Sequence, residues 1–167
     1  MFQVGDQVMY GVHGVCSITQ VEERTIDRKK LQYFVLEPTE QPGAKYYIPM
    51  HNEAALSKLR PIISREALVE ILESDEVHRD AWIADENQRK QHYRELITSG
   101  DRVSLVRMVR TLPQHKRNQA AAGRKFHLCD ENFLHDAERL LGSEFALVLD
   151  MPQEEVGGYV RTILKEE

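Results

Sequence analysis

The chain has 167 residues, of which 41% are hydrophobic and 29% charged, and its net charge at pH 7 is −5. This composition is typical of a globular protein with one medium domain or two small ones. No apolar run approaches the ~18 residues of a membrane-spanning helix, and no signal peptide is visible at the N-terminus. We therefore expect a cytoplasmic protein whose two cysteines, Cys16 and Cys129, are reduced.

The first part of the chain carries strand signals. Glycines at residues 11–14 favour a tight turn, and β-branched residues recur with the period of two that is typical of strands. A polar hairpin connection is expected at 26–30. Five short strands are predicted, at residues 7–10, 15–25, 31–37, 45–48 and within 54–62. Strands of this number and length predict a small SH3- or Tudor-like β-barrel over residues 1–63.

From residue 64 onward the apolar spacing becomes helical. Helices are predicted at 64–74, at 81–98, from 101 to just before Pro113, around 133–148, and from Pro152 onward. Ser64, Asp101 and Asp130 are the expected N-caps of the first, third and fourth of these. The sequence therefore predicts an α+β protein in which the barrel is followed by an all-helical domain at residues 64–167.

The charges are distributed unevenly along the helical part. Residues 89–125 hold ten basic and two acidic side chains, a net charge of +8, whereas the segments on either side are acidic. Such a basic block predicts a phosphate-binding face, because neutralising phosphates releases condensed counterions. An ordinary solvated helix surface explains the same block equally well.

Trp82 is the single tryptophan and stands just before the basic block. On a helix its stripe neighbours would be Asp85, Glu86 and Arg89, which are all polar, so we expect its ring to lie beyond the core-facing part. A core position under another helix is the alternative. An exposed ring followed by cations suits a wedge against a distorted base step. The candidate DNA-binding residues are Trp82, Arg89, Lys90 and Arg94.

Three motifs, taken together, resemble one family. Residues 5–15 read Gly-Asp-x-Val-x-Tyr-x-x-His-Gly-Val, residues 46–49 read Tyr-Tyr-Ile-Pro, and residues 82–90 read Trp-Ile-Ala-Asp-x-Asn-x-Arg-Lys. With these motifs in this order, the chain resembles the CarD/CdnL family of bacterial transcription regulators over essentially its whole length. Transcription-repair coupling factors share the N-terminal module for docking on RNA polymerase.

The resemblance implies that the barrel binds the protrusion (first lobe) of the RNA polymerase β subunit. It also implies that the helical domain contacts the minor groove of promoter DNA at the upstream edge of the bubble, without base-specific readout. There Trp82 would match the family tryptophan that slows collapse of the bubble. We expect a monomer that needs no cofactor or metal. The candidate polymerase-binding residues are Arg24, Lys45, Tyr46, Tyr47, Ile48 and Pro49, where the predicted strand at 45–48 could pair with a strand of the polymerase.

Two other classes of function were weighed. An enzyme would need partners for His13, but no carboxylate or nucleophile stands at a suitable spacing, and nucleotide-binding and zinc-protease motifs are missing. We therefore expect His13 to pack within its turn and expect no enzymatic activity. The second alternative is a protein–protein adaptor on RNA polymerase, in which the helical domain docks another protein and does not contact DNA.

Overall fold

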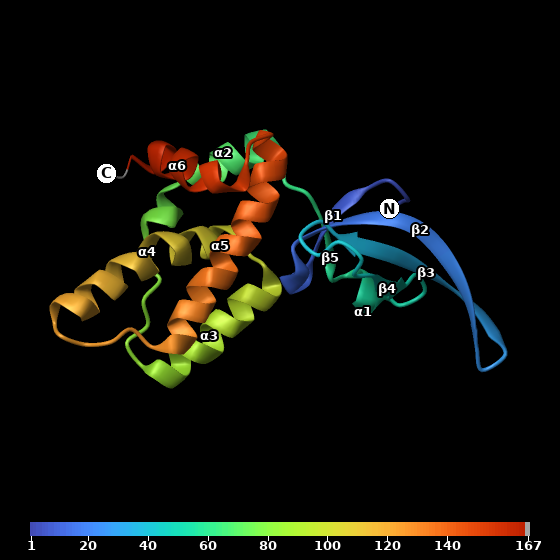
Figure 1. Ribbon diagram of the computed structural model, residues 1–167, viewed down its shortest axis with the longest axis horizontal. Coiled ribbons are helices and arrows are strands. Elements are labelled where there is room, and N and C mark those ends of the chain that lie inside the picture. Colours follow the sequence, from blue (N-terminus) through green and yellow to red (C-terminus); the bar gives the residue numbers. More distant parts are fainter. Residues whose placement is uncertain (166–167) are drawn as a thin grey trace. The chain divides into compact units, whose positions relative to one another are not determined.

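Figure 1 shows a computed structural model of the protein, which describes residues 1–165. The chain divides into two compact units, residues 1–62 and a helical unit that begins at Ile63. The first unit is a five-stranded antiparallel sheet in the order β4-β3-β2-β1-β5. Its elements are β1 (Gln7–Tyr10), a 3-10 turn η1 (Gly11–His13), β2 (Val15–Ile26), β3 (Lys29–Pro38), β4 (Tyr46–Pro49), a short helix α1 (Glu53–Leu56) and β5 (Leu59–Pro61).

The α+β class is confirmed, but the expected Tudor-like barrel is not. In residues 1–62, all of which the structure describes, β4 and β5 are the two edges of the sheet and do not pair with each other. Both edge strands are short and end in proline, at Pro49 and Pro61. Proline cannot donate a ladder hydrogen bond, so neither end favours closure. A register shift between Ile18 and Gln20 bends the long strand β2 without closing the sheet.

The hairpin between β2 and β3 is tighter than the sequence predicts. Its turn is only Asp27-Arg28, with φ angles of 50° and 65°, and Ile26 pairs directly with Lys29. Two positive φ angles are the signature of the turn whose twist matches paired strands. Residues 26–30 are predicted as a connection because most of them are polar. On a hairpin that extends past the other strands, as Figure 1 shows, exposure is compatible with strand pairing.

The core of the sheet unit is formed by one face of the strands. Its buried members are Val8, Cys16, Ile18, Phe34, Leu36, Ile48 and Leu59. On β2 and β3 they alternate as the period of a pleated strand requires, at Cys16 and Ile18 and at Phe34 and Leu36, while Val35 is buried outside this cluster. This alternation explains why the strand positions were predictable from sequence.

Cys16 should be chemically inert in the folded protein. It has no exposed surface, and burial raises the pKa of its thiol from 9.0 to about 11. Since the thiolate is the reactive form, only about 0.1% of Cys16 is ionised at pH 8. We expect Ellman's reagent to titrate one thiol, Cys129, in the native protein and two in guanidinium chloride. A Cys129→Ser variant should show no fast native thiol, and a second fast thiol in the native wild type would contradict the burial of Cys16.

The same raised pKa has a definite sign for stability. A thiol that ionises at lower pH in the unfolded chain than in the folded one favours unfolding at high pH. The contribution of Cys16 is therefore complete below about pH 9 and is lost as the pH rises through about 11.

The helical unit is built around α5. Its elements are α2 (Arg65–Glu73), a 3-10 turn η2 (Asp75–His78), α3 (Glu86–Ser99), α4 (Arg102–Ala121), α5 (Leu128–Leu149) and α6 (Gln153–Leu164). Helices α3, α4 and α6 each pack against α5. The largest fully buried side chains include Tyr93, Met108, Leu112, Leu140 and Phe145. Two expected caps are confirmed, because Ser64 accepts from the Ala67 N–H and Asp101 from the Ser104 N–H.

Helix α3 begins five residues later than predicted. Asp85 caps it by accepting from the Gln88 N–H at 2.8 Å, so residues 81–84 lie outside the helix. A carboxylate at this position satisfies a backbone donor that has no partner within the helix. Trp82 is consequently a loop residue.

Two further helix boundaries differ from the prediction. Helix α4 continues through Pro113 to Ala121, because the adjacent Thr111 and Leu112 are buried against the core and packing outweighs the lost backbone hydrogen bond. Helix α5 begins at Leu128 with His127 as its N-cap residue, so Asp130 lies within the first turn and is not the cap. Its carboxylate is buried and is used elsewhere, as described below.

Candidate nucleic-acid interface

Trp82 lies in the irregular segment between η2 and α3 and is partly buried. Three side chains from other elements surround its indole. The His115 ring of α4 stacks on it with a centroid distance of 4.5 Å and an interplanar angle of 10°. The Arg89 guanidinium carbon lies 4.2 Å from the ring centroid, and the centroid of Phe126 lies 6.1 Å away. The indole therefore sits on a support of aromatic and cationic groups and also packs against the hydrophobic core, and the residue as a whole is only partly buried.

The backbone of this segment is held by side chains rather than by regular structure. Five consecutive or nearly consecutive carbonyls accept hydrogen bonds from two helices, α3 and α4. The donors are Arg110 Nη1 to His78 O (2.9 Å), Arg107 Nε to Arg79 O (3.2 Å), Arg107 Nη2 to Asp80 O (2.9 Å), Tyr93 OH to Ala81 O (2.7 Å) and Arg89 Nη1 to Ile83 O (2.9 Å). Unpaired backbone groups are costly when they leave water. These bonds hence fix the loop, which we call the Trp82 loop (residues 79–84), in one conformation.

Arg89 is an internal support of this loop. Its Nε and Nη2 donate to the two Asp130 oxygens at 2.9 and 2.8 Å, and the side chains of Arg89 and Asp130 are only 2% and 0% exposed. The hydrogen bond to Asp130 is the main reason that the pKa of Arg89 is raised. The sequence analysis placed Arg89 on a DNA phosphate, and its burial contradicts this. Arg89 joins α3 to α5 and supports the indole.

Asp80 completes the support on the opposite side. Its Oδ2 lies 2.8 Å from His115 Nε2, and its Oδ1 accepts from the Trp82 N–H at 2.9 Å. Burial alone would raise the pKa of the Asp80 carboxyl, but hydrogen bonds from His115 and the Trp82 N–H, with the charges of His115 and Arg110, hold it below its usual value. The ionised carboxylate thus orients the ring that stacks on the indole.

The remaining predicted DNA contacts differ in availability. Lys90 pairs with Glu86 one helical turn away at 2.9 Å, and this hydrogen bond raises the pKa of Lys90. Arg94 is exposed and, in residues 1–165, forms no ion pair with a carboxylate. Arg94 is therefore better placed than Lys90 to meet a phosphate.

Two cations beside the indole were missed as site residues. Arg124 and Lys125 are exposed and immediately precede Phe126, one of the aromatic neighbours of Trp82. Among the described residues neither pairs with a carboxylate. The sequence signal was present, because two adjacent cations followed by an aromatic residue end the basic block, but their proximity to Trp82 depends on the fold.

The predicted polymerase-binding residues of the sheet unit gather at the edge strand β4. Tyr47 is 38% exposed, and the Arg24 guanidinium lies 4.0 Å from its ring centroid. Tyr46 packs against Tyr10 and against His13, whose ring centroid is 4.2 Å away, so His13 packs on aromatic neighbours. Tyr10 and Tyr46 pack against the core of the sheet unit, whereas Tyr47 and Arg24 form a cationic and aromatic surface on the opposite face.

Lys45 and Ile48 do not belong to that surface as predicted. Lys45 precedes β4 and lies 4.0 Å from Glu37, and the Ile48 side chain is only 3% exposed within the core. One side of β4 pairs with β3, and the other side is a free sheet edge. The Met50 N–H donates to Gln32 O and Ile48 pairs with Phe34 in the same register, so the Ile48 backbone is directed to β3 and the free edge presents the backbone of Tyr47.

Comparison with known proteins agrees with this division. Residues 2–63 match the family model described as CarD-like/TRCF RID domain, and residues 67–161 match the model described as CarD, C-terminal domain. The chain belongs to the CarD family. A Bacillus subtilis (strain 168) relative with the name "Putative transcription factor YdeB" is 23% identical over 159 residues, covering 95% of this chain and 99% of the relative.

Membership of the CarD family makes this chain a CarD-like transcription factor. The Trp82 loop lies within the region that matches the CarD C-terminal domain, and β4 lies within the region that matches the RID domain. Across residues 1–165, no helix is both long and apolar enough to cross a membrane, and no three potential metal ligands gather.

Proposed function

We propose that this protein binds RNA polymerase through its sheet unit and stabilises the open promoter complex by presenting Trp82 to the upstream fork of the bubble. The observation that supports the proposal most directly is the Trp82 loop. An indole is held by a stacked histidine, a buried arginine and carbonyl-directed hydrogen bonds, yet it is left partly exposed. A ring that served only the hydrophobic core would not need this polar framework.

A preorganised indole suits the wedge role energetically. Stacking of a base on an aromatic side chain contributes on the order of 1–3 kcal/mol, which corresponds to about a ten- to hundredfold change in an equilibrium. Because the Trp82 loop is already fixed, little conformational entropy is lost when DNA binds. A protein that binds the open complex more tightly than the closed one shifts the equilibrium towards the open state.

The phosphate contacts in this proposal come from exposed cations. Arg94, Arg124 and Lys125 take the role that the sequence analysis gave to Arg89. Contacts of this kind carry no sequence information. They predict that affinity falls with salt, with a slope of roughly −0.9 for each phosphate neutralised on duplex DNA.

The sheet unit provides the attachment in this proposal. The free edge of β4 can add to a strand of the polymerase β-subunit protrusion by main-chain hydrogen bonding, with Tyr47 and Arg24 beside it. Attachment raises the effective concentration of the helical unit at the fork, so weak DNA contacts are sufficient.

Substitution of Trp82 tests the proposal. We expect Trp82→Ala to shorten the lifetime of the open complex about ten- to hundredfold relative to wild type, because the stacking energy is lost. Trp82→Phe should retain part of the effect. The lifetime is measured by competitor challenge of preformed complexes, and binding to an isolated β-protrusion fragment is measured in parallel.

The controls separate this function from the adaptor alternative. Trp82→Ala should bind the β-protrusion fragment as wild type does, and its thermal melting should show a folded helical unit. If the folded variant stabilised open complexes like wild type, the wedge would be wrong and a polymerase adaptor without DNA contact would be favoured. If β4 variants lost binding to the β-protrusion fragment, attachment through the sheet unit would be supported, whether the helical unit acts as a wedge or as an adaptor.

A further inference from the structure

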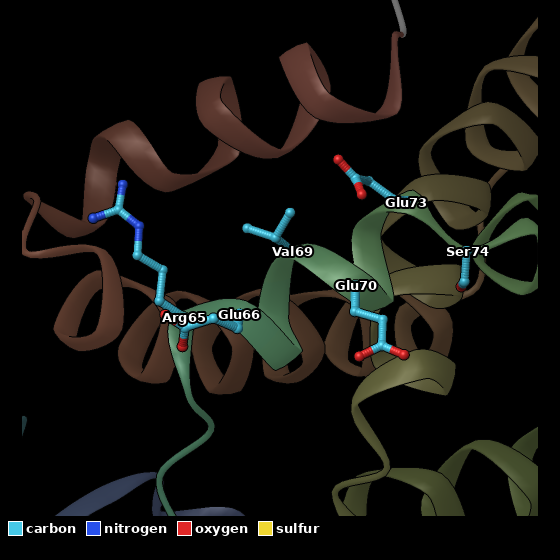
Figure 2. A pocket seen from close by; sticks show the side chains of 6 residues that line it. All are labelled: Arg65, Glu66, Val69, Glu70, Glu73 and Ser74. Atoms are coloured by element: carbon cyan, nitrogen blue, oxygen red, sulfur yellow. The ribbon is translucent and has the colours of Figure 1, made fainter.

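Two hollows in the described part of the helical unit have linings that differ in kind. One lies along α2 and is lined by six residues of that helix and its end, namely Arg65, Glu66, Val69, Glu70, Glu73 and Ser74 (Figure 2). Half of this lining is glutamate, from one exposed helix face. The other is a groove of about 800 Å3 lined by three helices. None of its lining residues belongs to the Trp82 loop.

The groove arises because α4 and α6 both pack on α5. One wall comes from α4 through Val109, Arg110, Pro113 and Arg117, whose spacing places them on one helix face. The floor comes from α5 through His135, Glu138, Arg139, Gly142 and Phe145, and the other wall from α6 through Gln153, Glu154, Gly157, Val160 and Arg161. Its volume is within the ~300–1,000 Å3 range of ligand sites.

The basic side chains of α5 and α6 gather at this groove, whereas most of their acidic side chains lie outside it. Helices α5 and α6 carry seven acidic residues but only two arginines or lysines, Arg139 and Arg161, and both of these line the groove. Of the seven acidic residues only Glu138 and Glu154 do so. With Arg110 and Arg117 from α4, the groove has four arginines against two glutamates within an otherwise acidic pair of helices.

The spacing of the arginines indicates the shape of the occupant. Arg110 and Arg117 are seven residues apart on α4, which corresponds to about 10 Å along the helix at ~1.5 Å per residue. Between the charges lie partly exposed apolar side chains, including Val109, Pro113 and Val160. An amphipathic segment with carboxylates about two turns apart and an apolar face between them matches both features.

The middle of α6 is open at Gly157. This glycine lies on the groove side of α6, where an added Cβ would meet only the flexible Arg161 Nη2 at 3.7 Å. Glycine within a helix costs about 1 kcal/mol relative to alanine, and no close neighbour requires it here. Because Gly157 has no side chain, the α6 wall does not project into the groove at this position.

We infer that the groove between α4, α5 and α6 is a docking site for an acidic amphipathic helix of a partner protein. The four arginines pair with its carboxylates, and the apolar floor and walls bury its hydrophobic face. The groove lining includes no residue of the Trp82 loop or of β4, although Arg110 also donates to the His78 carbonyl just before that loop, so a further protein could be attached without occupying either set of residues.

A designed peptide tests this inference on the full chain. The probe is a fluorescein-labelled helical peptide of about sixteen residues, with leucines at the helical period and glutamates two turns apart. We expect saturable binding by fluorescence anisotropy. A scrambled peptide of the same composition should bind at least tenfold more weakly. Amide shifts in 15N spectra should map to α6 and to the groove faces of α4 and α5.

Two neighbouring glycines offer a matched pair of variants. Gly157→Leu fills the groove and should weaken the peptide at least tenfold. Gly158→Leu carries the same side chain on the same helix, but Gly158 does not line the groove and has open space around it, so binding should be unchanged. Arg161→Glu should weaken binding as Gly157→Leu does, and it keeps the test valid if Gly157→Leu does not fold. Both leucine variants should keep their open-complex activity.

Other outcomes would overturn the inference. Equal peptide affinity for Gly157→Leu and Gly158→Leu would place the peptide elsewhere, as would amide shifts confined to other faces. Binding of pyrophosphate without binding of the peptide would assign the groove to a small anion. A concentration-dependent dimer that Gly157→Leu dissociates would assign it to a second copy of this chain.

Discussion

Substitution of Asp130 with alanine is expected to lower the free energy of unfolding of the helical unit by about 3–5 kcal/mol. Asp130 has no exposed surface and accepts two hydrogen bonds from Arg89, which is itself only 2% exposed. The alanine variant leaves a guanidinium buried without its counter-ion. Since domains of this size are stable by only about 5–15 kcal/mol, the loss should be visible as a large shift of the urea midpoint, measured by circular dichroism.

The neighbouring residue provides a matched control. Glu131 pairs with Lys116, and both side chains are at least 40% exposed. Surface pairs of this kind contribute about 0–1 kcal/mol, so Glu131→Ala should hardly move the midpoint. Equal losses for Asp130→Ala and Glu131→Ala would show that the Arg89–Asp130 pair is not the buried support described above.

A double variant separates stability from positioning. Arg89→Met with Asp130→Leu replaces the buried ion pair by apolar side chains, which often restores or exceeds the original stability. The Ile83 carbonyl then loses its donor and the indole loses its cation. We expect a well-folded variant with altered Trp82 fluorescence and a shorter open-complex lifetime. Normal stability together with normal fluorescence and lifetime would contradict a positioning role for Arg89.

The roles of Arg89 and Asp130 illustrate what a single sequence cannot provide. They are separated by 41 positions, and each has an ordinary local explanation, as a surface cation and as a helix cap. Only the packing of α3 on α5 brings them together. The strands of the sheet unit were predictable because their alternation is local, whereas a long-range buried pair leaves no periodic signal. The open sheet was likewise unpredictable, since closure depends on pairing between β4 and β5.

The Trp82 loop was only partly predictable. The polar residues that follow Trp82 predicted a ring beyond the core-facing part of a helix from residue 81, whereas Trp82 lies in a loop before α3 and packs against the hydrophobic core. A local signal for the true start was available, because Asp85 followed by Gln88 is a capping pattern. The stacking on His115 and the hydrogen bonds from Arg107 could not be foreseen, since both residues lie on α4, and Arg107 is 28 positions from Arg79, the carbonyl that it contacts. Part of the basic block therefore serves the loop's backbone rather than DNA.

The second large effect is expected at Glu144, the other buried carboxylate of the helical unit. Glu144 is 2% exposed, accepts from Arg102 Nε and Nη2 at 2.6 Å each, and also accepts from the Ile63 N–H at 3.0 Å. It therefore ties the start of α4 and the segment just before α2 to the C-terminal half of α5. Three elements depend on one side chain.

Removal of the arginine should be more damaging than neutralisation of the acid. Arg102→Met leaves Glu144 buried and unpaired, and we expect a loss of about 3–5 kcal/mol in the free energy of unfolding. Glu144→Gln keeps an oxygen for the Ile63 N–H and leaves no buried charge, since Arg102 is 20% exposed and can reach water. Its loss should be nearer 1–3 kcal/mol. Urea unfolding of both variants, followed by circular dichroism, measures the difference.

The variant that combines Arg102→Met with Glu144→Gln completes a double-mutant cycle. Because Arg102→Met is costly mainly through the charge that it strands, combining it with Glu144→Gln should cost less than the sum of the two single changes, with a coupling of at least about 1 kcal/mol. Arg94→Met, the same substitution at an exposed site on α3, should change stability by only about 0.5 kcal/mol or less. Strictly additive losses, or a loss for Arg102→Met no greater than for Arg94→Met, would show that Glu144 does not depend on Arg102 and that the junction of α2, α4 and α5 is held by apolar packing alone.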